Sequence, residues 1–332
     1  MRGSTGRCTV RAHANIALSK YWGKSDLALN LPAVPSISMT LSGLVTETEV
    51  RFDASLRADE VYLDGGPASP KEARRVVTML DQVRAAAKHE HRAVVRSVNR
   101  FPTAAGLASS ASGFAALAAA ATRAAGLEWD DSRVSALARQ ASASAARSVF
   151  GGFVELPAGK PGQAKLAARQ LHREDHWDLR IVVAETAKGP KKVGSTEGME
   201  RSRVTSPFYD AWVDAAPGLS QKVKRGLQKR DLPLLGAAME QSTLAFHACA
   251  MASAPGILYF QPATLAALAT VRELREERGI EVFATMDAGP HVKALCHASD
   301  AARVRRALGR TEGVIATGVS APGPGVEILK WD

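Results

Sequence analysis

The segment 99–113 has a composition that suits phosphate binding. It reads NRFPTAAGLASSASG: a predicted strand ends, small residues follow, and Ser109 and Ser110 fall in the expected first turn of a helix. A helix N-terminus offers free backbone N–H groups and a positive dipole end, and small side chains let a phosphate approach the backbone. The segment has neither the Gly-x-x-x-x-Gly-Lys-Ser/Thr nor the Gly-x-Gly-x-x-Gly pattern. A phosphate loop and a close-packed alanine-glycine helix therefore stay open as equal alternatives.

Three further segments carry polar side chains that suit anion binding or proton transfer. Their candidate residues are Asn15, Lys20, Tyr21 and Lys24 in 13–24, Ser142, Ser144 and Arg147 in 139–148, and Asp287 in 285–291. An arginine fork matches the oxygens of phosphate or carboxylate. Each segment alone also has an ordinary explanation: solvated lysines, a tightly packed helix of small residues, and a turn-forming aspartate.

Several other chemistries are excluded by spacing. The sequence has no His-Glu-x-x-His and no Gly-x-Ser-x-Gly, and Glu90 between His89 and His91 has the wrong spacing for a zinc helix. Cys8, Cys249 and Cys296 are far apart and odd in number, which argues against a disulfide framework. A reducing cytoplasm is therefore the expected location.

The charge balance suits an anionic partner, which could be a nucleic acid, an acidic membrane or a phosphorylated metabolite, and a solvated basic surface is its ordinary explanation. Lys and Arg number 43 against 33 Asp and Glu, a formal net charge of +10, while 46% hydrophobic and 23% charged residues are typical of an ordinary folded protein. RNA binding is a poor explanation, because Trp22 is the only aromatic beside Tyr21 in a basic turn. We expect a small-molecule substrate, with no nucleic acid and no membrane as partner.

Interleaved helices and strands must position these candidates. Strands are predicted over 8–16, 36–44, 47–62, 94–99, 151–156, 179–184, 281–286, 314–318 and 326–329. Helices are predicted over 71–88, from the small-residue segment to about 125, and over 131–144, 206–215, 223–252, 263–278 and 301–308. The uncharged stretch 101–122 is too rich in Ala, Gly and Ser for a membrane span, so a buried helix is expected. No regular doubly wound unit recurs, which favours an α+β fold with a boundary near residue 180.

Taken in order, six segments resemble signatures of the diphosphomevalonate decarboxylase family, in the GHMP kinase superfamily. They are 15–24, 31–41, 101–113, 150–155, 194–199 and 286–290. The resemblance implies a GHMP kinase fold with a ribosomal-protein-S5-like N-terminal half and a ferredoxin-like C-terminal half. It implies an ATP-binding domain over 1–180, a second domain over 181–332, an active site in the cleft between them, and a homodimer.

The resemblance also implies an activity and a set of residue roles. ATP and Mg²⁺ would serve the phosphorylation of mevalonate 5-diphosphate at its C3 hydroxyl, followed by loss of phosphate and CO₂ to give isopentenyl diphosphate. Asp287, Lys20 and Arg147 would be catalytic. The substrate would contact Asn15, Tyr21, Lys24, Ser142, Ser144 and Arg147. ATP would contact Pro102, Ala104, Ala105, Gly106, Leu107, Ala108, Ser109, Ser110, Ser112 and Ser195, with Ser110 near Mg²⁺.

Three residues depart from the family pattern. Ala141 and Ala143 stand where glycines are usual, and His291 stands where asparagine is usual. The added methyl groups are expected either to tighten the diphosphate pocket or to shift its backbone slightly. A phosphomevalonate decarboxylase or another mevalonate-type kinase therefore stays open as the alternative, although Asp287 together with Lys20 favours a decarboxylase.

Overall fold

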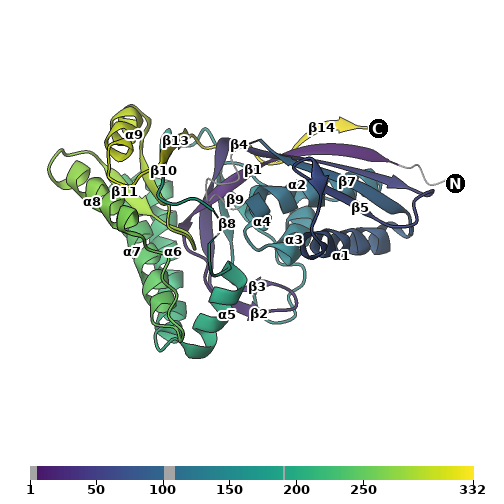
Figure 1. Cartoon of the computed structure of the whole chain (residues 1–332), viewed down its shortest axis with the longest axis horizontal. Helices are drawn as coiled ribbons and strands as arrows, with labels where there is room; N and C mark the ends of the chain where they lie inside the picture. The colour runs from purple at the N-terminus through teal and green to yellow at the C-terminus, as the bar shows by residue number, and fades with distance from the viewer. Residues whose placement is uncertain (1–5, 101–108, 190) are drawn as a thin grey trace.

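The computed structural model describes residues 6–100, 109–189 and 191–332, and a larger β-sheet forms the N-terminal part of the molecule (Figure 1). In the described chain its strand order is β14-β1-β4-β7-β5-β6, with β8 paired to β4 and β9 to β8. The strands are β1 (Arg7–Ser19), β4 (Ser36–Asp53), β5 (Glu60–Leu63), β6 (Gly66–Pro67), β7 (Arg92–Asn99), β8 (Phe153–Leu156), β9 (Arg169–His172) and β14 (Glu327–Trp331). Burial along β1 alternates as far as Arg11 and is continuous from Ala12 to Ser19. The second half of β1 is therefore covered on both faces.

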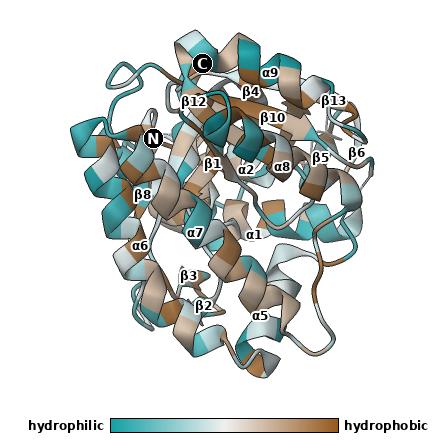
Figure 2. Cartoon of the chain, turned by 90° about the vertical axis from the view of Figure 1, so that its left-hand side faces the viewer, coloured by the Kyte–Doolittle hydropathy of each residue, from teal (hydrophilic) through white to brown (hydrophobic). Residues whose placement is uncertain are grey.

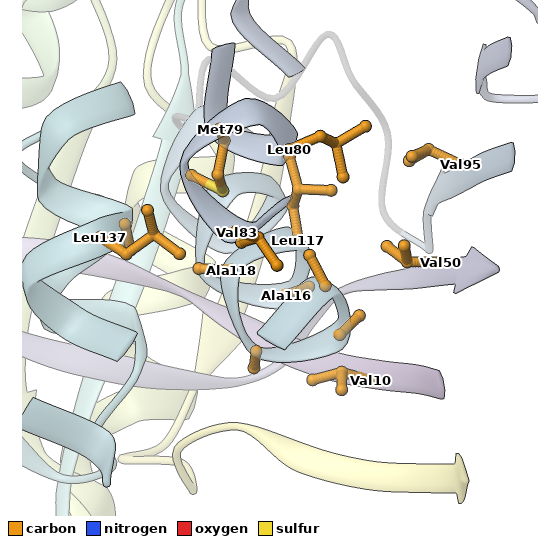
Figure 3. Close-up of a cluster of buried hydrophobic side chains, with 14 of the residues drawn as sticks. Val10, Val50, Met79, Leu80, Val83, Val95, Ala116, Leu117, Ala118 and Leu137 are labelled. Carbon is orange, nitrogen blue, oxygen red and sulfur yellow. The ribbon is translucent and has the colours of Figure 1, made fainter. Parts of the chain in front are cut away.

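Helices α1 to α4 cover one face of this sheet. They are α1 (Pro70–Ala87), α2 (Ser109–Ala124), α3 (Asp131–Ala141) and α4 (Ala145–Ser148). Figure 3 shows Ala116, Leu117 and Ala118 of α2 between the strands and the side chains of α1 and α3. Alanines occupy most of the buried positions of α2, so this helix packs closely against its neighbours without a wide apolar stripe. The buried helix expected in place of a membrane span is thus present from Ser109 onward.

Local capping fixes the start of α1. Ser69 accepts a hydrogen bond from the N–H of Glu72, the Glu72 carboxylate accepts one from the N–H of Ser69, and Pro70 occupies the first turn. This reciprocal cap satisfies two backbone donors that would otherwise lack partners. It sets the direction of a helix whose Arg75 reaches the candidate site described below.

A smaller sheet forms the C-terminal part, with the antiparallel order β11-β12-β10-β13 in the described chain. Its strands are β10 (Leu179–Glu185), β11 (Val282–Thr285), β12 (Val292–His297) and β13 (Ala316–Ser320). Alternate side chains of β10 enter different cores: Ile181 and Val183 pack toward the larger sheet, and Val182 and Ala184 pack under α8 (Pro262–Glu276) and α9 (Ala301–Gly309). The short turn η1 (Ala298–Asp300) leads into α9.

The hairpin of α6 (Tyr209–Lys229) and α7 (Leu232–Met251) joins the two sheets. Its apolar residues share one core with β1, β4 and β10, which explains the double-sided burial of β1. Helix α5 (Ser195–Thr205) and the small pair β2 (Lys24–Asp26) and β3 (Leu31–Pro32) lie near the lower end of this hairpin (Figures 1 and 2). The site residues that follow β1 therefore sit where both sheets and the hairpin meet.

The α+β prediction is confirmed, and several element boundaries differ. One long strand, β4, covers the predicted strand 36–44 and the first part of the predicted strand 47–62. The helix predicted over 131–144 ends at Ala141. The break between α6 and α7 falls at Arg230, which has a left-handed backbone with φ of 53°, and α6 continues through Pro217. Helix α5 and strands β9 and β12 were not predicted. No helix of the described residues is long and apolar enough to cross a membrane.

Candidate active site

A cavity of about 340 Å³ collects most of the residues predicted from the sequence. The predicted residues on its wall are Asn15, Lys20, Tyr21, Lys24, Ser110, Ser142, Ser144, Arg147, Ser195 and Asp287. They come from the end of β1 and the turn after it, from the start of α2, from the α3–α4 junction, from α5 and from the β11–β12 turn. Segments more than 250 residues apart in the chain, such as Lys20 and Asp287, are thus brought into contact.

Asp287 lies between two lysines. Lys20 Nζ is 2.8 Å from Asp287 Oδ1, and Lys293 Nζ on β12 is 3.3 Å from Oδ2. Burial alone would raise the pKa of Asp287, but the charges of the two lysines and their hydrogen bonds hold that pKa well below its usual range. The carboxylate is therefore ionised near neutral pH, and its side chain remains 38% exposed toward the cavity.

Lys20 is held tightly at the end of β1. Its side chain is 3% exposed, its Nζ also donates to the carbonyl of Ala17 at 2.9 Å, and its backbone N–H donates to Ser242 Oγ on α7. Burial lowers the pKa of Lys20 to about 8, against the attraction of Asp287, which raises it. The Lys20 ammonium is therefore mostly protonated at neutral pH and loses its proton at a pH slightly above neutral.

Arg147 and Asn15 form a second buried group. Asn15 Nδ2 donates to the Ser144 carbonyl at 3.0 Å and to Ser148 Oγ at 2.7 Å, so its amide is fixed against α4. Arg147 donates to Ser36 Oγ at 2.7 Å and to Asn15 Oδ1 at 3.3 Å. Its Nε has no partner in the part of the chain that the structure describes, and burial lowers its pKa to about 10. A buried guanidinium with an unused N–H is suited to an anionic ligand.

Four more of the predicted residues line the same cavity. The Tyr21 hydroxyl is buried without a partner among the described residues, and burial raises its pKa. Ser142 and Ser144 hydroxyls lie 3.1 Å apart in the extended turn between α3 and α4. Burial and the charge of Arg75 lower the pKa of Lys24. Together these groups provide three hydroxyl donors and one ammonium on the wall of the cavity.

A second cavity of about 250 Å³ shares two lining residues, Ser110 and Arg75, with the first. Its wall includes Thr46, Thr48, Leu63, Asp64, Glu72, Val76, Val95, Ser97, Asn99, Gly113, Phe114 and Leu117. The Arg75 guanidinium stacks 4.4 Å over the Phe114 ring and donates to the Ala141 carbonyl. The two cavities thus share one residue of α1 and one of the N-terminal turn of α2.

Most of the predicted phosphate loop lies outside the residues that the structure describes. Pro102, Ala104, Ala105, Gly106, Leu107 and Ala108 lie outside the described residues. Ser109 is the first residue of α2. Ser112 is fully buried with its hydroxyl 2.7 Å from Thr46 Oγ1, so it lies behind the wall and lines neither cavity.

Three basic residues of the site were missed by sequence reasoning. Lys191 donates to Ser195 Oγ at 2.7 Å and to the Ala288 carbonyl at 2.9 Å, which connects the start of α5 to the Asp287 turn. Arg75 and Lys293 are the others. Arg75 sits in an ordinary amphipathic helix and has no local signal. Lys293 did have a local signal in the sequence, because a lysine inside the apolar run after Pro290 is unusual for a buried strand.

The departures from the family pattern have structural partners. Ala143 lines the larger cavity yet is only 3% exposed, because it packs with Ala146, Val154 and Leu156. His291 Nδ1 accepts the backbone N–H of Thr186 at 3.1 Å, and burial lowers the pKa of His291 to about 4. His291 is therefore neutral near pH 7 and anchors the Asp287 turn to β10.

Comparisons with known proteins cover nearly the whole chain. Family models described as "Diphosphomevalonate decarboxylase-like N-terminal domain" and "Mevalonate 5-diphosphate decarboxylase C-terminal domain" match residues 12–167 and 181–314. The diphosphomevalonate decarboxylase of Schizosaccharomyces pombe is 35% identical over 303 residues, which cover 86% of this chain and 77% of that protein. The crystal structure of mevalonate diphosphate decarboxylase from Staphylococcus aureus is 37% identical, with a TM-score of 0.92 and 98% of each chain covered. A structure of MDDEF in complex with MVAPP, AMPPCP and magnesium is 36% identical, with a TM-score of 0.91 over 98% of this chain and 99% of that one.

Proposed function

This chain belongs to the diphosphomevalonate decarboxylase family, and from that premise we infer how its residues carry out the ATP-dependent decarboxylation of mevalonate 5-diphosphate. The substrate occupies the larger cavity and ATP the smaller one. The observation that carries this assignment is the Asp287 carboxylate, held ionised beside Lys20, in a cavity that shares Ser110 with a second one. The Asp287 carboxylate and the γ-phosphate of ATP can therefore both reach the C3 hydroxyl of the substrate.

The charge of the larger cavity supports a polyanionic substrate. Five basic side chains line it, Lys20, Lys24, Arg75, Arg147 and Lys191, against the one carboxylate of Asp287 among the described residues. Such an excess of one sign concentrates ligands of the opposite sign in the cleft. We assign the substrate carboxylate to Arg147 and Asn15, and the diphosphate to the donors contributed by Tyr21, Lys24, Ser142 and Ser144. The unused Arg147 Nε and Tyr21 hydroxyl support these two assignments.

Asp287 accepts the proton of the C3 hydroxyl at Oδ1 while that oxygen attacks the γ-phosphorus, and ADP leaves. The C3–O bond then breaks with its electron pair going to phosphate, and the C1–C2 pair forms the C2=C3 double bond as CO₂ departs. Positive charge develops at C3 during this step, and an anionic carboxylate nearby stabilises it. Lys20 holds the carboxylate ionised and oriented through the 2.8 Å contact.

The smaller cavity and the start of α2 form the proposed ATP site. The helix N-terminus at Ser109 suits phosphate binding, and we assign the phosphates to this turn, to the segment 102–108 and to Ser195, with Ser112 behind this turn, where its hydroxyl contacts Thr46 Oγ1. Among the described residues no group of three or more His, Cys, Asp or Glu forms a metal cage. This fits Mg²⁺, which commonly binds through phosphate oxygens and water with few protein ligands. We assign Ser110 as its protein ligand. Bound there, Mg²⁺ would neutralise charge on the transferred phosphoryl group.

A product assay tests the function against its alternatives. Purified protein is given ATP, Mg²⁺ and in turn mevalonate, its 5-phosphate and its 5-diphosphate, while ADP, phosphate and CO₂ are followed together. We expect equal amounts of the three products, fastest with the diphosphate. ADP without CO₂ would identify a kinase. A tenfold preference for the monophosphate, ~1.4 kcal/mol of discrimination, would identify a phosphomevalonate decarboxylase.

We further propose a domain boundary near residue 180, with the site in the cleft between the two parts, a cytoplasmic location and a homodimer. The three cysteines are free and buried, which supports a reducing compartment. An outward stripe on α7, at Ala237, Gln241, Leu244, Ala248 and Met251, supports the dimer, because Leu244 is 49% and Met251 42% exposed. Helical spacing places these residues on one face, and an exposed apolar face of this kind commonly marks an interface.

A further inference from the structure

Lys293 is a fully buried cation on an inner strand of the smaller sheet. Strand β12 runs between β11 and β10, where Lys293 pairs in register with Thr285 and Val183. Its side chain is 1% exposed, and its ion pair in the described chain is with Asp287. Burying an ammonium is strongly unfavourable unless a carboxylate compensates it. A residue of this type on an inner strand therefore calls for an explanation beyond packing.

The two lysines reach Asp287 in different ways. Lys20 contacts Oδ1 and lines the larger cavity, whereas Lys293 contacts Oδ2 and is not among the cavity residues. Lys293 therefore approaches the carboxylate from the sheet. One oxygen is held from behind, and the other faces the space assigned to the substrate.

The local charge is not balanced in the free protein. Asp287 carries one negative charge, while Lys20, Lys293 and the buried Arg147 carry three positive charges. The excess is unfavourable for folding, but it is compensated when polyanions enter the cavity. Polyanions also raise the pKa of a neighbouring carboxylate, because like charges disfavour ionisation. A second lysine opposes that rise without occupying substrate space.

We propose that Lys293 is a positioning residue for Asp287, which holds Oδ2 on the sheet side, leaves Oδ1 facing the cavity, and keeps the carboxylate ionised while both anionic substrates are bound. This inference rests on the proposed role of Asp287 as the base. It adds a second cation, from a different strand, to the Lys20–Asp287 pair.

Of the charged groups near Asp287 in the described chain, Lys20 and Lys293 are the two that pair with its carboxylate. The titratable groups that face it are Lys20 after β1, Lys293 on β12, Lys191 before α5, Arg147 on α4 and His247 on α7. Burial lowers the pKa of His247 to about 3, so His247 is neutral above pH 5. The lowered pKa of Lys20, about 8, affects the alkaline side of a pH profile. Because the pKa of Asp287 lies well below its usual range, the acid limb assigned to Asp287 lies below pH 5 in the wild type, and the test measures its upward shift in variants of Lys293.

The test is the pH dependence of kcat in Lys293→Met and Lys293→Arg, with Lys222→Met, an exposed lysine of α6, as matched control. Removing one cation this close shifts a carboxyl pKa by about one to three units. We expect the acid limb of the Met variant to move upward by at least about one unit, so that kcat at the acid end falls about tenfold while kcat at pH 8 stays within about threefold. The Arg variant and the control should keep the wild-type limb.

A double variant separates positioning from structural support. If Lys293 acts through Asp287, adding Lys293→Met to Asp287→Asn lowers kcat no further, whereas independent effects would multiply. An unmoved acid limb in a folded Met variant, or multiplicative losses, would overturn the proposal. If Lys293→Met does not fold, Lys293→Gln replaces it under the same criteria. An Asp287→Asn protein that keeps its activity would refute the base itself, which is a different outcome from an unmoved limb.

Discussion

Replacing Asp287 by asparagine tests the proposed base directly. Asparagine keeps the size of the side chain and one oxygen acceptor, but it removes the negative charge and the ability to take a proton. In the structure both carboxylate oxygens face lysines, at 2.8 and 3.3 Å. The substitution therefore removes the proton acceptor from the cavity and the counter-charge from two buried ammonium groups at once.

The catalytic loss should be large and confined to turnover. A positioned general base contributes about 10²- to 10⁴-fold, so we expect kcat to fall by roughly that factor. KM for mevalonate 5-diphosphate should change far less, because the carboxylate and diphosphate of the substrate are assigned to other residues. A fall in kcat with a nearly constant KM distinguishes the loss of a base from the loss of a binding residue.

The stability loss should be moderate. Removing one partner of a fully buried ion pair destabilises a protein by ~3–5 kcal/mol. Asp287 is 38% exposed, so solvent screening reduces this, and we expect ~1–3 kcal/mol. Because the pKa of Asp287 is lowered on folding, its contribution is present above the usual carboxyl value of 3.8 and is lost as the pH falls toward the lower folded-state pKa. The stability gap between wild type and variant should therefore be constant from pH 5 to 7 and narrow in strong acid.

The assay combines steady-state release of ADP and CO₂ with thermal unfolding across pH. Asp214→Asn, an exposed aspartate of α6, is the matched control and should leave both readouts unchanged. If Asp287→Asn keeps more than about a tenth of wild-type turnover, Asp287 is only a turn residue and another group must take the proton. A stability gap that widens in acid would show that the sign of the pKa shift is wrong.

Four further predictions concern other parts of the site and surface. Arg147→Met should raise KM for mevalonate 5-diphosphate at least about tenfold while thermal stability is equal or higher, because a buried guanidinium without a carboxylate partner is unfavourable; a large loss of stability would contradict this. The kcat/KM of the wild type should decline as pH rises through about 8, where Lys20 loses its proton, and Lys20→Arg should remove that alkaline limb. Ser110→Ala should lower turnover and raise the Mg²⁺ concentration needed for half-maximal rate, without unfolding; an unchanged Mg²⁺ dependence would remove Ser110 from the metal site. Leu244→Glu should convert a dimer to a monomer in sedimentation, and a wild type that is already monomeric would refute the assigned interface.

Sequence reasoning predicted elements with strong local signals. The apolar spacing of α1, the strand that ends before Arg100 and the apolar periodicity of the last helices all follow from short-range rules. The α6–α7 break was misplaced because Pro217 and Gly218 resemble a boundary, whereas tertiary packing keeps the helix continuous until Arg230. Strand β12 was missed because its buried lysine interrupts the apolar run that would have marked it.

The site residues also divide into those with a signal in the local sequence and those without one. Asn15 and Asp287 stand at the ends of predicted strands and Lys20 in the turn after the first of them, but each segment alone had an ordinary explanation, and the resemblance to the family supplied their roles. Arg75 and Lys191 could not be found in this way, because their importance comes only from long-range contacts.

Local sequence rules describe groups whose hydrogen bonds, apolar contacts or counter-charges come from the protein itself, as in a capped helix, an alternating strand or a paired charge. The groups that mark this site break those rules in the free protein. The Tyr21 hydroxyl and Arg147 Nε are buried without partners among the described residues, and Lys293 shares its carboxylate with a second lysine. Each feature opposes stability, so each is explained only by what binding supplies: an acceptor for the hydroxyl and the guanidinium, and negative charge for the excess cations. The cavity is therefore best understood as a set of unsatisfied groups that an anionic substrate completes.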